Sequence, residues 1–201
     1  MSIFLKVLAA ISVLSFLGAP TDSNAAIITF DDLPSSKTET IANGGLYEGL
    51  YWLGFYSVNP LIDSVGPGGV NAVVSGSNIA YVNPLGLHAI YSPTPFTLNG
   101  GYFSVAYDSV DFYLIGSLGG TTLYYSYVSV SDQGSTYVSA NWTGIDMLYI
   151  YPAGITGPSL ADFNILIDDL DVTFSNVPLP AALPLFAAGL AGLGLMRKKK
   201  A

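Results

Sequence analysis

Short apolar runs separated by turn residues fill the chain between its two ends. From Ala26 onward, Gly, Pro, Asn and Ser recur between runs of Tyr, Phe, Val and Ile, without helical periodicity beyond a couple of turns. Short strands at this spacing are typical of all-β proteins. We therefore predict one all-β domain, a jelly-roll-like β-sandwich. Strands are expected at 26–32, 50–58, 71–76, 79–83, 96–107, 110–117, 121–131, 136–142, 146–152 and 163–174.

The clearest hairpin joins segments 110–117 and 121–131 across the sequence "SLGG". Gly119 and Gly120 supply the positive φ angles that a tight hairpin turn needs. In the second segment Tyr125 and Tyr127 have the same parity, so they share one face of the strand.

Two Asp-Asp pairs lie where strand alternation slips by one residue. In "FNILIDDLDVTF" the parity of the apolar residues changes at Asp168 and Asp169, which predicts a β-bulge, and the first strand slips similarly at Asp31 and Asp32. The first and last strands of jelly rolls commonly pair, so we expect these carboxylates to crowd one edge. A calcium ion would relieve their repulsion. Alternatively, the aspartates turn the chain and bind nearby backbone amides.

The N-terminus has the three-part layout of a secretory signal peptide. Lys6 precedes an apolar run over 7–19, and small residues stand at Ser23 and Ala25. This layout predicts a signal helix within residues 1–25, cleaved after Ala25. The chain contains no cysteine, so the exported domain depends on its core or on bound metal rather than on disulfides.

The C-terminus joins a short apolar helix to a basic cluster. Residues 181–196 contain no charged or polar side chain, and their helix would be roughly 24 Å long. Spanning a hydrocarbon core of roughly 30 Å then requires help from 177–180 or a thinner bilayer. Flanking cations stay cytoplasmic, so the body is expected outside the cytoplasm. The cluster is Arg197, Lys198, Lys199 and Lys200.

This tail resembles the VPLPA variant of the PEP-CTERM sorting signal, over residues 177–201. The sequence "VPLPA", a Gly/Ala/Leu-rich helix and the terminal cations follow one another in that family's order. The resemblance implies a Gram-negative bacterium that makes extracellular polysaccharide, transient anchoring in the inner membrane, and recognition by an exosortase-type membrane protease. It implies a final location at the cell surface or in the extracellular matrix. The motif residues are Val177, Pro178, Leu179, Pro180 and Ala181.

The charge of the body, residues 26–176, excludes several classes of function. Thirteen carboxylates stand against a single cation, Lys37, so we expect no binding to nucleic acid. Glycoside hydrolysis requires two facing carboxylates, and nothing in the spacing of the only glutamates, Glu39 and Glu48, selects a pair. His88 is the only histidine, so one chain cannot form a histidine-rich metal site, and a serine or cysteine nucleophile would need His88 as its base. We therefore expect a protein without catalytic residues.

The body also resembles exported PEP-CTERM proteins whose mature part opens with a strand like "ITFDDL" and ends with one like "IDDLDVTF". That group is similar to carbohydrate-binding-module-like jelly rolls, and the resemblance implies no defined ligand or site. Flat aromatic side chains stack on sugar faces, which makes polysaccharide the expected partner. A self-associating matrix protein and a carbohydrate-active enzyme remain alternatives. The candidate ligand-binding residues are Tyr51, Trp52, Tyr125 and Tyr127.

Overall fold

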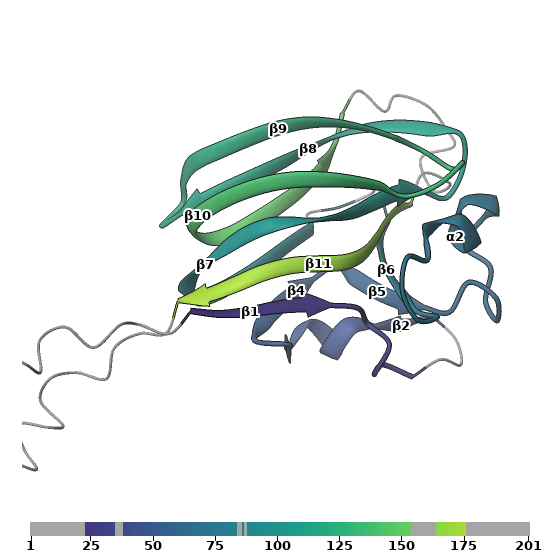
Figure 1. Ribbon diagram of the computed structural model, residues 1–201, viewed down its shortest axis with the longest axis horizontal. Coiled ribbons are helices and arrows are strands. Elements are labelled where there is room, and N and C mark those ends of the chain that lie inside the picture. The colour runs from purple at the N-terminus through teal and green to yellow at the C-terminus, as the bar shows by residue number, and fades with distance from the viewer. Residues whose placement is uncertain (1–22, 35–37, 84–85, 87, 154–163, 176–201) are drawn as a thin grey trace, which may run out of the picture. The chain divides into compact units, whose positions relative to one another are not determined.

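The antiparallel strands of the domain form one hydrogen-bonded sheet that folds over into two layers (Figure 1). The computed structural model describes residues 23–34, 38–83, 86, 88–153 and 164–175, and Asn24–Ser175 form one compact unit. The predicted all-β sandwich is confirmed. The strands are β1 (Ser23–Ile28), β2 (Glu39–Thr40), β3 (Leu46–Tyr47), β4 (Leu50–Leu53), β5 (Phe55–Val58), β6 (Ile79–Val82), β7 (His88–Val105), β8 (Ser109–Leu118), β9 (Thr121–Ser131), β10 (Thr136–Pro152) and β11 (Ile165–Ser175); the helices are η1 (Ile41–Gly44) and α2 (Pro67–Ala72).

The strand order is β2-β5-β6-β11-β7-β10-β8-β9, with β1 on β11, β4 on β7 and β3 on β4. The first and last strands therefore pair, as the sequence predicts.

Most of the signal peptide (1–25) and all of the sorting signal (177–201) lie outside the described residues, although Ser23–Ala25 open β1. None of the helices in the described ranges has the length and apolarity to cross a membrane.

Two long strands carry the chain through both layers. β7 and β10 pair along both of their halves, and β7 also pairs with β11 at one end and β4 at the other. The β7–β10 register shifts between Ser139 and Met147, where Asn141 and Gly144 have φ angles of 55° and 72°. These bulges bend a continuous strand. The separate strands expected at 136–142 and 146–152 are thus one strand.

The structure confirms the predicted hairpin and the bulge in the last strand, and it corrects two of the predicted strands. The hairpin at Gly119 and Gly120 is confirmed, with φ angles of 57° and 80°. The bulge in the last strand is confirmed by a register shift after Asp168. The strand predicted at 50–58 is split in two, because Gly54 (φ 77°) breaks it. The strand predicted at 71–76 is wrong, because a helix that begins at Pro67 runs through Ala72.

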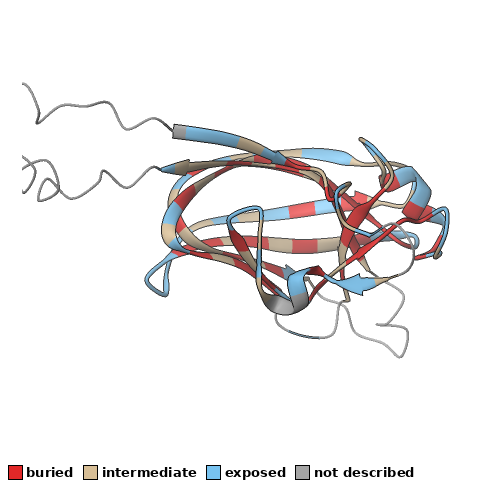
Figure 2. Cartoon of the chain, turned by 90° about the horizontal axis from the view of Figure 1, so that it is seen from below, coloured by how far each residue is buried: buried red, intermediate tan, exposed pale blue. Residues whose placement is uncertain are grey.

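The main core lies between the two layers, where Figure 2 shows buried positions on strands of both. Trp52 is fully buried at its centre, with its ring 5.4 Å from that of Phe30 and 5.2 Å from that of Phe55, both edge-on. Edge-on packing suits the opposite charges of ring face and ring edge. Alternation along each strand sends every second apolar side chain into this core.

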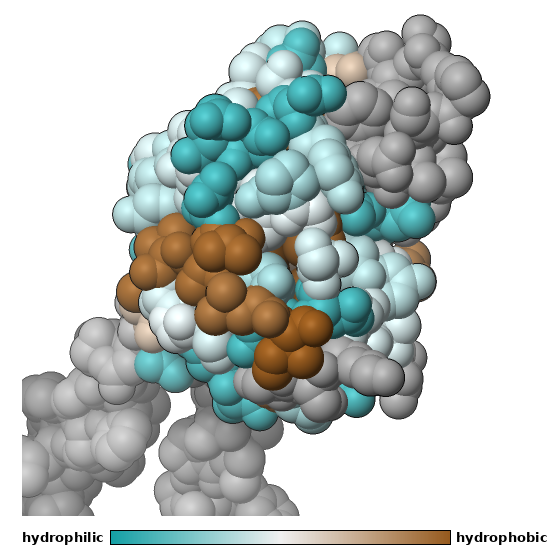
Figure 3. All heavy atoms as spheres, turned by 90° about the vertical axis from the view of Figure 1, so that its right-hand side faces the viewer, coloured by the Kyte–Doolittle hydropathy of each residue, from teal (hydrophilic) through white to brown (hydrophobic). Residues whose placement is uncertain are grey.

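A second, smaller core lies beneath α2, on the outer side of β6 and β11. Its members are Val58, Val65, Ala72, Ile79 and Leu166. The same end of the molecule exposes apolar surface, seen in Figure 3 and contributed around α2 by Leu61, Ile62, Val70 and Val74.

Two of the predicted aspartates hold the loop 73–78 that follows α2. Asp168 accepts amide hydrogen bonds from residues 74–75 at 2.7 and 3.1 Å, and Asp31 accepts two from residues 77–78 at 2.7 and 3.0 Å. A charged acceptor strengthens each of these bonds. The loop is therefore fixed from both sides, by Asp168 within β11 and by Asp31 in the turn that follows β1.

Gly76 lies in the middle of this loop, and we predict that Gly76→Ala lowers the free energy of unfolding by about 2 kcal/mol or more. Gly76 has φ 55°, and a Cβ there would lie 1.8 to 2.0 Å from the carboxyl group of Asp31. Urea unfolding measures the change. The matched control is Gly134→Ala, where a Cβ meets nothing within 4 Å. Equal losses in the two variants would contradict the loop geometry.

Candidate functional site

Outward-facing tyrosines from five neighbouring strands cover one side of the sheet, called here the tyrosine face. Strand alternation selects them, because their neighbours Phe112, Leu114, Leu148 and Ile150 point into the core. Strand register places them in three neighbouring rows: Tyr127, Tyr113 and Tyr151 in one, Tyr125 and Tyr149 in the next, and Tyr91 and Tyr51 in the third. The face consists of Tyr51, Tyr91, Tyr113, Tyr125, Tyr127, Tyr149 and Tyr151.

The rings at the β8–β9 end form a contact cluster. Tyr113 lies opposite Tyr127 on β9 and Tyr151 on β10. Its ring centroid is 5.1 Å from that of Tyr125 and 5.4 Å from that of Tyr127. Tyr125 is 59% exposed and Tyr151 is 56% exposed, so flat phenol surface is open to solvent.

A second ring pair continues the face on the β7 and β4 side. Tyr51 and Tyr91 lie directly opposite each other, and their rings stack at 4.9 Å with planes 13° apart. Tyr91 also lies opposite Met147 of β10, and Met147 in turn lies opposite Ser117 of β8. Cross-strand aromatic pairs of this kind stabilise the sheet and hold each ring in a fixed orientation.

A carboxylate stands at the border of the cluster. Asp111 accepts hydrogen bonds from the hydroxyl of Ser129, at 2.6 Å, and from that of Tyr127. These two donors lower the pKa of Asp111, and Asp111 raises the pKa of Tyr127. The carboxylate is therefore charged at neutral pH and remains accessible as an acceptor for ligand hydroxyl groups.

Three of the four predicted ligand-binding aromatics, Tyr51, Tyr125 and Tyr127, lie on this face. Trp52 does not, because it is fully buried and its Nε1 donates to the backbone oxygen of Tyr47 at 3.0 Å. Its prediction as a ligand-binding residue is corrected on this ground. Sequence reasoning missed Tyr91, Tyr113, Tyr149 and Tyr151, although alternation within strands 110–117 and 146–152 marks the last three.

The four predicted metal ligands do not converge on one point. Asp31 and Asp168 bind the loop amides, Asp169 accepts from the hydroxyl of Ser75 at 2.5 Å, and Asp32 accepts from that of Tyr47 at 2.5 Å. Within the ranges that the structure describes, no group of three or more His, Cys, Asp or Glu side chains is placed to hold a metal ion. Calcium binding stays a prediction.

Asp168 is the most buried of these carboxylates, with 1% of its surface exposed. Burial raises its pKa to about 6, although the amides of residues 74, 75 and 169 favour the charged form. Burial destabilises the charged carboxylate, and the three backbone N–H groups stabilise it. A carboxylate can therefore occupy this buried position.

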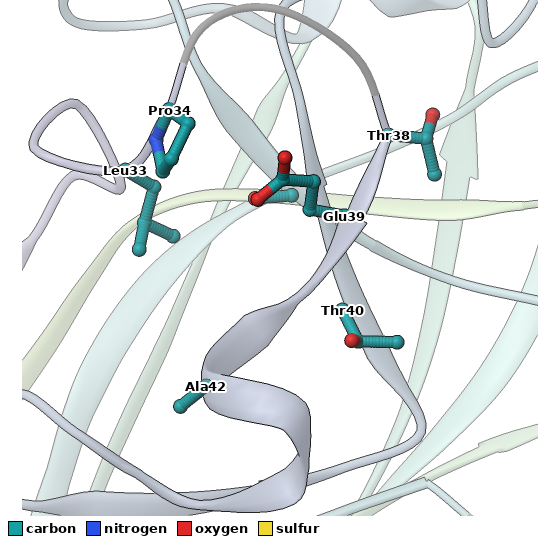
Figure 4. Close-up of a pocket in the computed structure, with 7 residues that line it drawn as sticks. Leu33, Pro34, Thr38, Glu39, Thr40 and Ala42 are labelled. Carbon is teal, nitrogen blue, oxygen red and sulfur yellow. The ribbon is translucent and has the colours of Figure 1, made fainter.

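A pocket of about 500 Å³ lies elsewhere, beside β2 (Figure 4). Its described lining includes one ionisable group, Glu39, whose carboxylate is directed toward Leu33 and Pro34. The other glutamate, Glu48, occupies the turn between β3 and β4 with φ 48°. The described lining thus does not supply the two facing carboxylates of a glycosidase.

His88 is buried at the start of β7, and burial lowers its pKa. Its Nδ1 donates to the backbone oxygen of Gly54 at 3.1 Å, and its ring lies edge-on to that of Phe55. These contacts are those of a core histidine.

Comparison with solved structures gives distant similarities in fold. No protein-family model matches the chain, and no curated protein matches its sequence. An exo-β-agarase is 10% identical with a TM-score of 0.43, and the match covers 79% of this chain but only 26% of the agarase. TmCBM61 in complex with β-1,4-galactotriose is 7% identical with a TM-score of 0.29, covering 67% of this chain and 89% of that one. At these values neither likeness bears on what the chain binds.

The raised pKa of Asp168 predicts a specific pH dependence. Its folded-state pKa of about 6 exceeds the ordinary value of 3.8, so its contribution to stability is full below pH 3.8 and is lost as the pH rises through 6. The free energy of unfolding of the wild type, minus that of Asp168→Asn, should fall by about 3 kcal/mol across this window.

Urea unfolding between about pH 3.5 and pH 7.5 measures this difference. Asp111→Asn is the control, because the pKa of Asp111 is lowered and its contribution should instead be lost as the pH falls. Parallel pH profiles for the wild type and Asp168→Asn would contradict the assignment.

Proposed function

We propose that the chain is an exported, non-catalytic protein of the cell surface or extracellular matrix whose tyrosine face associates with extracellular polysaccharide. The observation that carries the proposal is the alignment of outward tyrosines across five strands, with open ring surface at Tyr125, Tyr127 and Tyr151. Phenol rings offer apolar area to the faces of sugar rings and hydroxyl groups to their edges.

The shape of the face favours a polymer over a small molecule. Small ligands are usually held in enclosed clefts, whereas these tyrosines lie along a sheet surface that spans β9, β8, β10, β7 and β4. A sheet surface contacts several successive units of a chain without needing its end. This arrangement supports binding within a polysaccharide chain.

Charge supports a neutral saccharide as the ligand. The described residues include no Lys or Arg, and Asp111 stands at the border of the face. Phosphate and sulfate groups would be repelled there, since nothing described offers a compensating cation. Asp111 would accept hydrogen bonds from sugar hydroxyl groups, which are donors of the right kind.

We include in the proposal the route by which the chain reaches the cell surface. The sequence of residues 1–25 supports export, and the motif, apolar helix and cations of residues 177–201 support recognition by an exosortase-type protease and transient anchoring in the inner membrane. Both segments lie outside the residues whose structure is described.

The binding proposal is tested by the double substitution Tyr113→Ala and Tyr125→Ala. We expect the purified chain to be retarded in native gels that contain a neutral polysaccharide, and the double variant to lose about tenfold in affinity, since each aromatic contact contributes about 0.5 to 1.5 kcal/mol. Agarose, a galactan and a glucan serve as the panel.

The matched control is Tyr137→Ala. Tyr137 is 46% exposed and contacts Tyr102, but lies in the other half of β10, away from the tyrosine face. It should leave retardation unchanged. Absence of retardation on every neutral polysaccharide, or equal losses in the two variants, would refute the proposal.

The sorting proposal predicts that Pro178→Ala with Pro180→Ala blocks removal of the tail. The uncleaved precursor should then accumulate in the membrane fraction, because the altered motif escapes the protease while the helix still anchors the chain. Immunoblots of fractionated native cells measure the precursor. Pro184→Ala changes a proline outside the motif and should process normally; normal processing of the double variant would refute the role of the motif.

A further inference from the structure

Strand β9 gives the described sheet a long free edge. β9 has eleven residues and stands at one end of the strand order, whereas β2 at the other end has two. β1 and β3, which attach beside the main path, have six and two residues. Figure 1 shows β9 as the outermost strand of its layer.

The register identifies which backbone groups of β9 remain available. The N–H of Asp132 donates to the oxygen of Asp108 at 2.9 Å, and the pairing continues in the same register into β9. In an antiparallel pair, directly opposite residues alternate between bonded and non-bonded. Even-numbered residues from Tyr124 to Val130 therefore bind β8. Tyr125, Tyr127 and Ser129 direct their N–H and C=O groups away from β8, toward the free edge.

The usual protection of such an edge is missing. Thr121–Ser131 contains no Lys, no Pro and no charged residue of either sign. Natural sheets protect exposed edges with charges, prolines or very short strands, because free N–H and C=O groups pair with any extended strand. Only the C-terminal end is occupied, where Ser131 bridges to Gly134. Among the described strands, none pairs with the outer edge of β9 from Tyr125 to Ser129.

We propose that β9 of a second copy pairs antiparallel with this edge, about a two-fold axis at Ser126. In this register Tyr125 of each copy lies opposite Tyr127 of the other, and both residues carry outward N–H and C=O groups. Tyr124 lies opposite Val128, so the inward side matches as well. The tyrosine faces of the two copies become continuous.

A second copy fits this edge better than another strand because the sequence of β9 is complementary to itself. A two-fold pairing uses the same patch on both subunits and closes without forming a fibre. It creates two aromatic cross-strand pairs, which are among the favourable pairs in sheets. No charge in Thr121–Ser131 selects a charged partner, and none repels a copy at the edge itself.

The first test is sedimentation equilibrium of the full chain over a range of concentrations, with Ser129→Pro and Ser129→Ala as a matched pair. Both variants lose the hydroxyl bond to Asp111, but only proline removes the outward N–H. The wild type and Ser129→Ala should dimerise alike, and Ser129→Pro should raise the dissociation constant by about tenfold or more, since the proline ring would stand at the pairing edge beside each of the two Tyr125–Tyr127 pairs. A monomeric wild type, or equal dissociation constants for the two variants, would overturn the proposal.

If Ser129→Pro does not fold, hydrogen exchange of the wild type tests the dimer proposal instead. The amides of Tyr125 and Tyr127 should exchange rapidly in dilute wild-type chain and become protected as the concentration rises. Those of Ser126 and Val128, bonded to β8, should be protected throughout. Concentration-independent exchange at these two outward amides would overturn the proposal, while polysaccharide binding, measured separately, would be unaffected.

Discussion

The pairing of β7 with β10 is the constraint on which the rest of the fold depends. These strands pair along both halves, and β4, β8 and β11 attach directly to one or the other. A flat ladder of this length would leave one face of the sheet uncovered. The bulges at Asn141 and Gly144 bend the ladder instead, so that its two halves enter different layers and the core closes between them. The tyrosine face lies on the outer side of this bent ladder.

A domain that is acidic and contains no described cation must satisfy its carboxylates by other means. Asp31 and Asp168 accept backbone amides, while Asp32 and Asp111 accept tyrosine hydroxyls. A backbone N–H that binds a carboxylate fixes the backbone at that residue. A lysine would not do so, because its ammonium group stands on a flexible side chain. Asp31 and Asp168 thereby attach the loop after α2 to β11 and to the turn after β1, and this fixes the conformation of the loop.

Much of the sheet could be predicted from alternation, because each strand has one buried face. The bulge at Asp168 and the pairing of β1 with β11 followed from parity and position in the chain. The helix at Pro67 escaped prediction because "PGGVNA" has weak helical propensity, and its packing over β11 decides its conformation. Trp52 was misplaced for a related reason: in "LYWL" either parity is apolar, and only the layer beneath β4 determines which side chain is buried.

The tyrosine face and the proposed dimer edge both include β9, but they use perpendicular directions of that strand. In β9 the side chains of Tyr125 and Tyr127 stand normal to the sheet, while their backbone groups lie within its plane, so pairing at the edge does not require burial of the ring faces. Two joined faces would offer a polysaccharide two linked sites, and a polymer held at one would meet the second at high effective concentration. If the proposed polysaccharide binding holds, weak stacking at each tyrosine would then add up to firm retention, because one polymer occupies both sites.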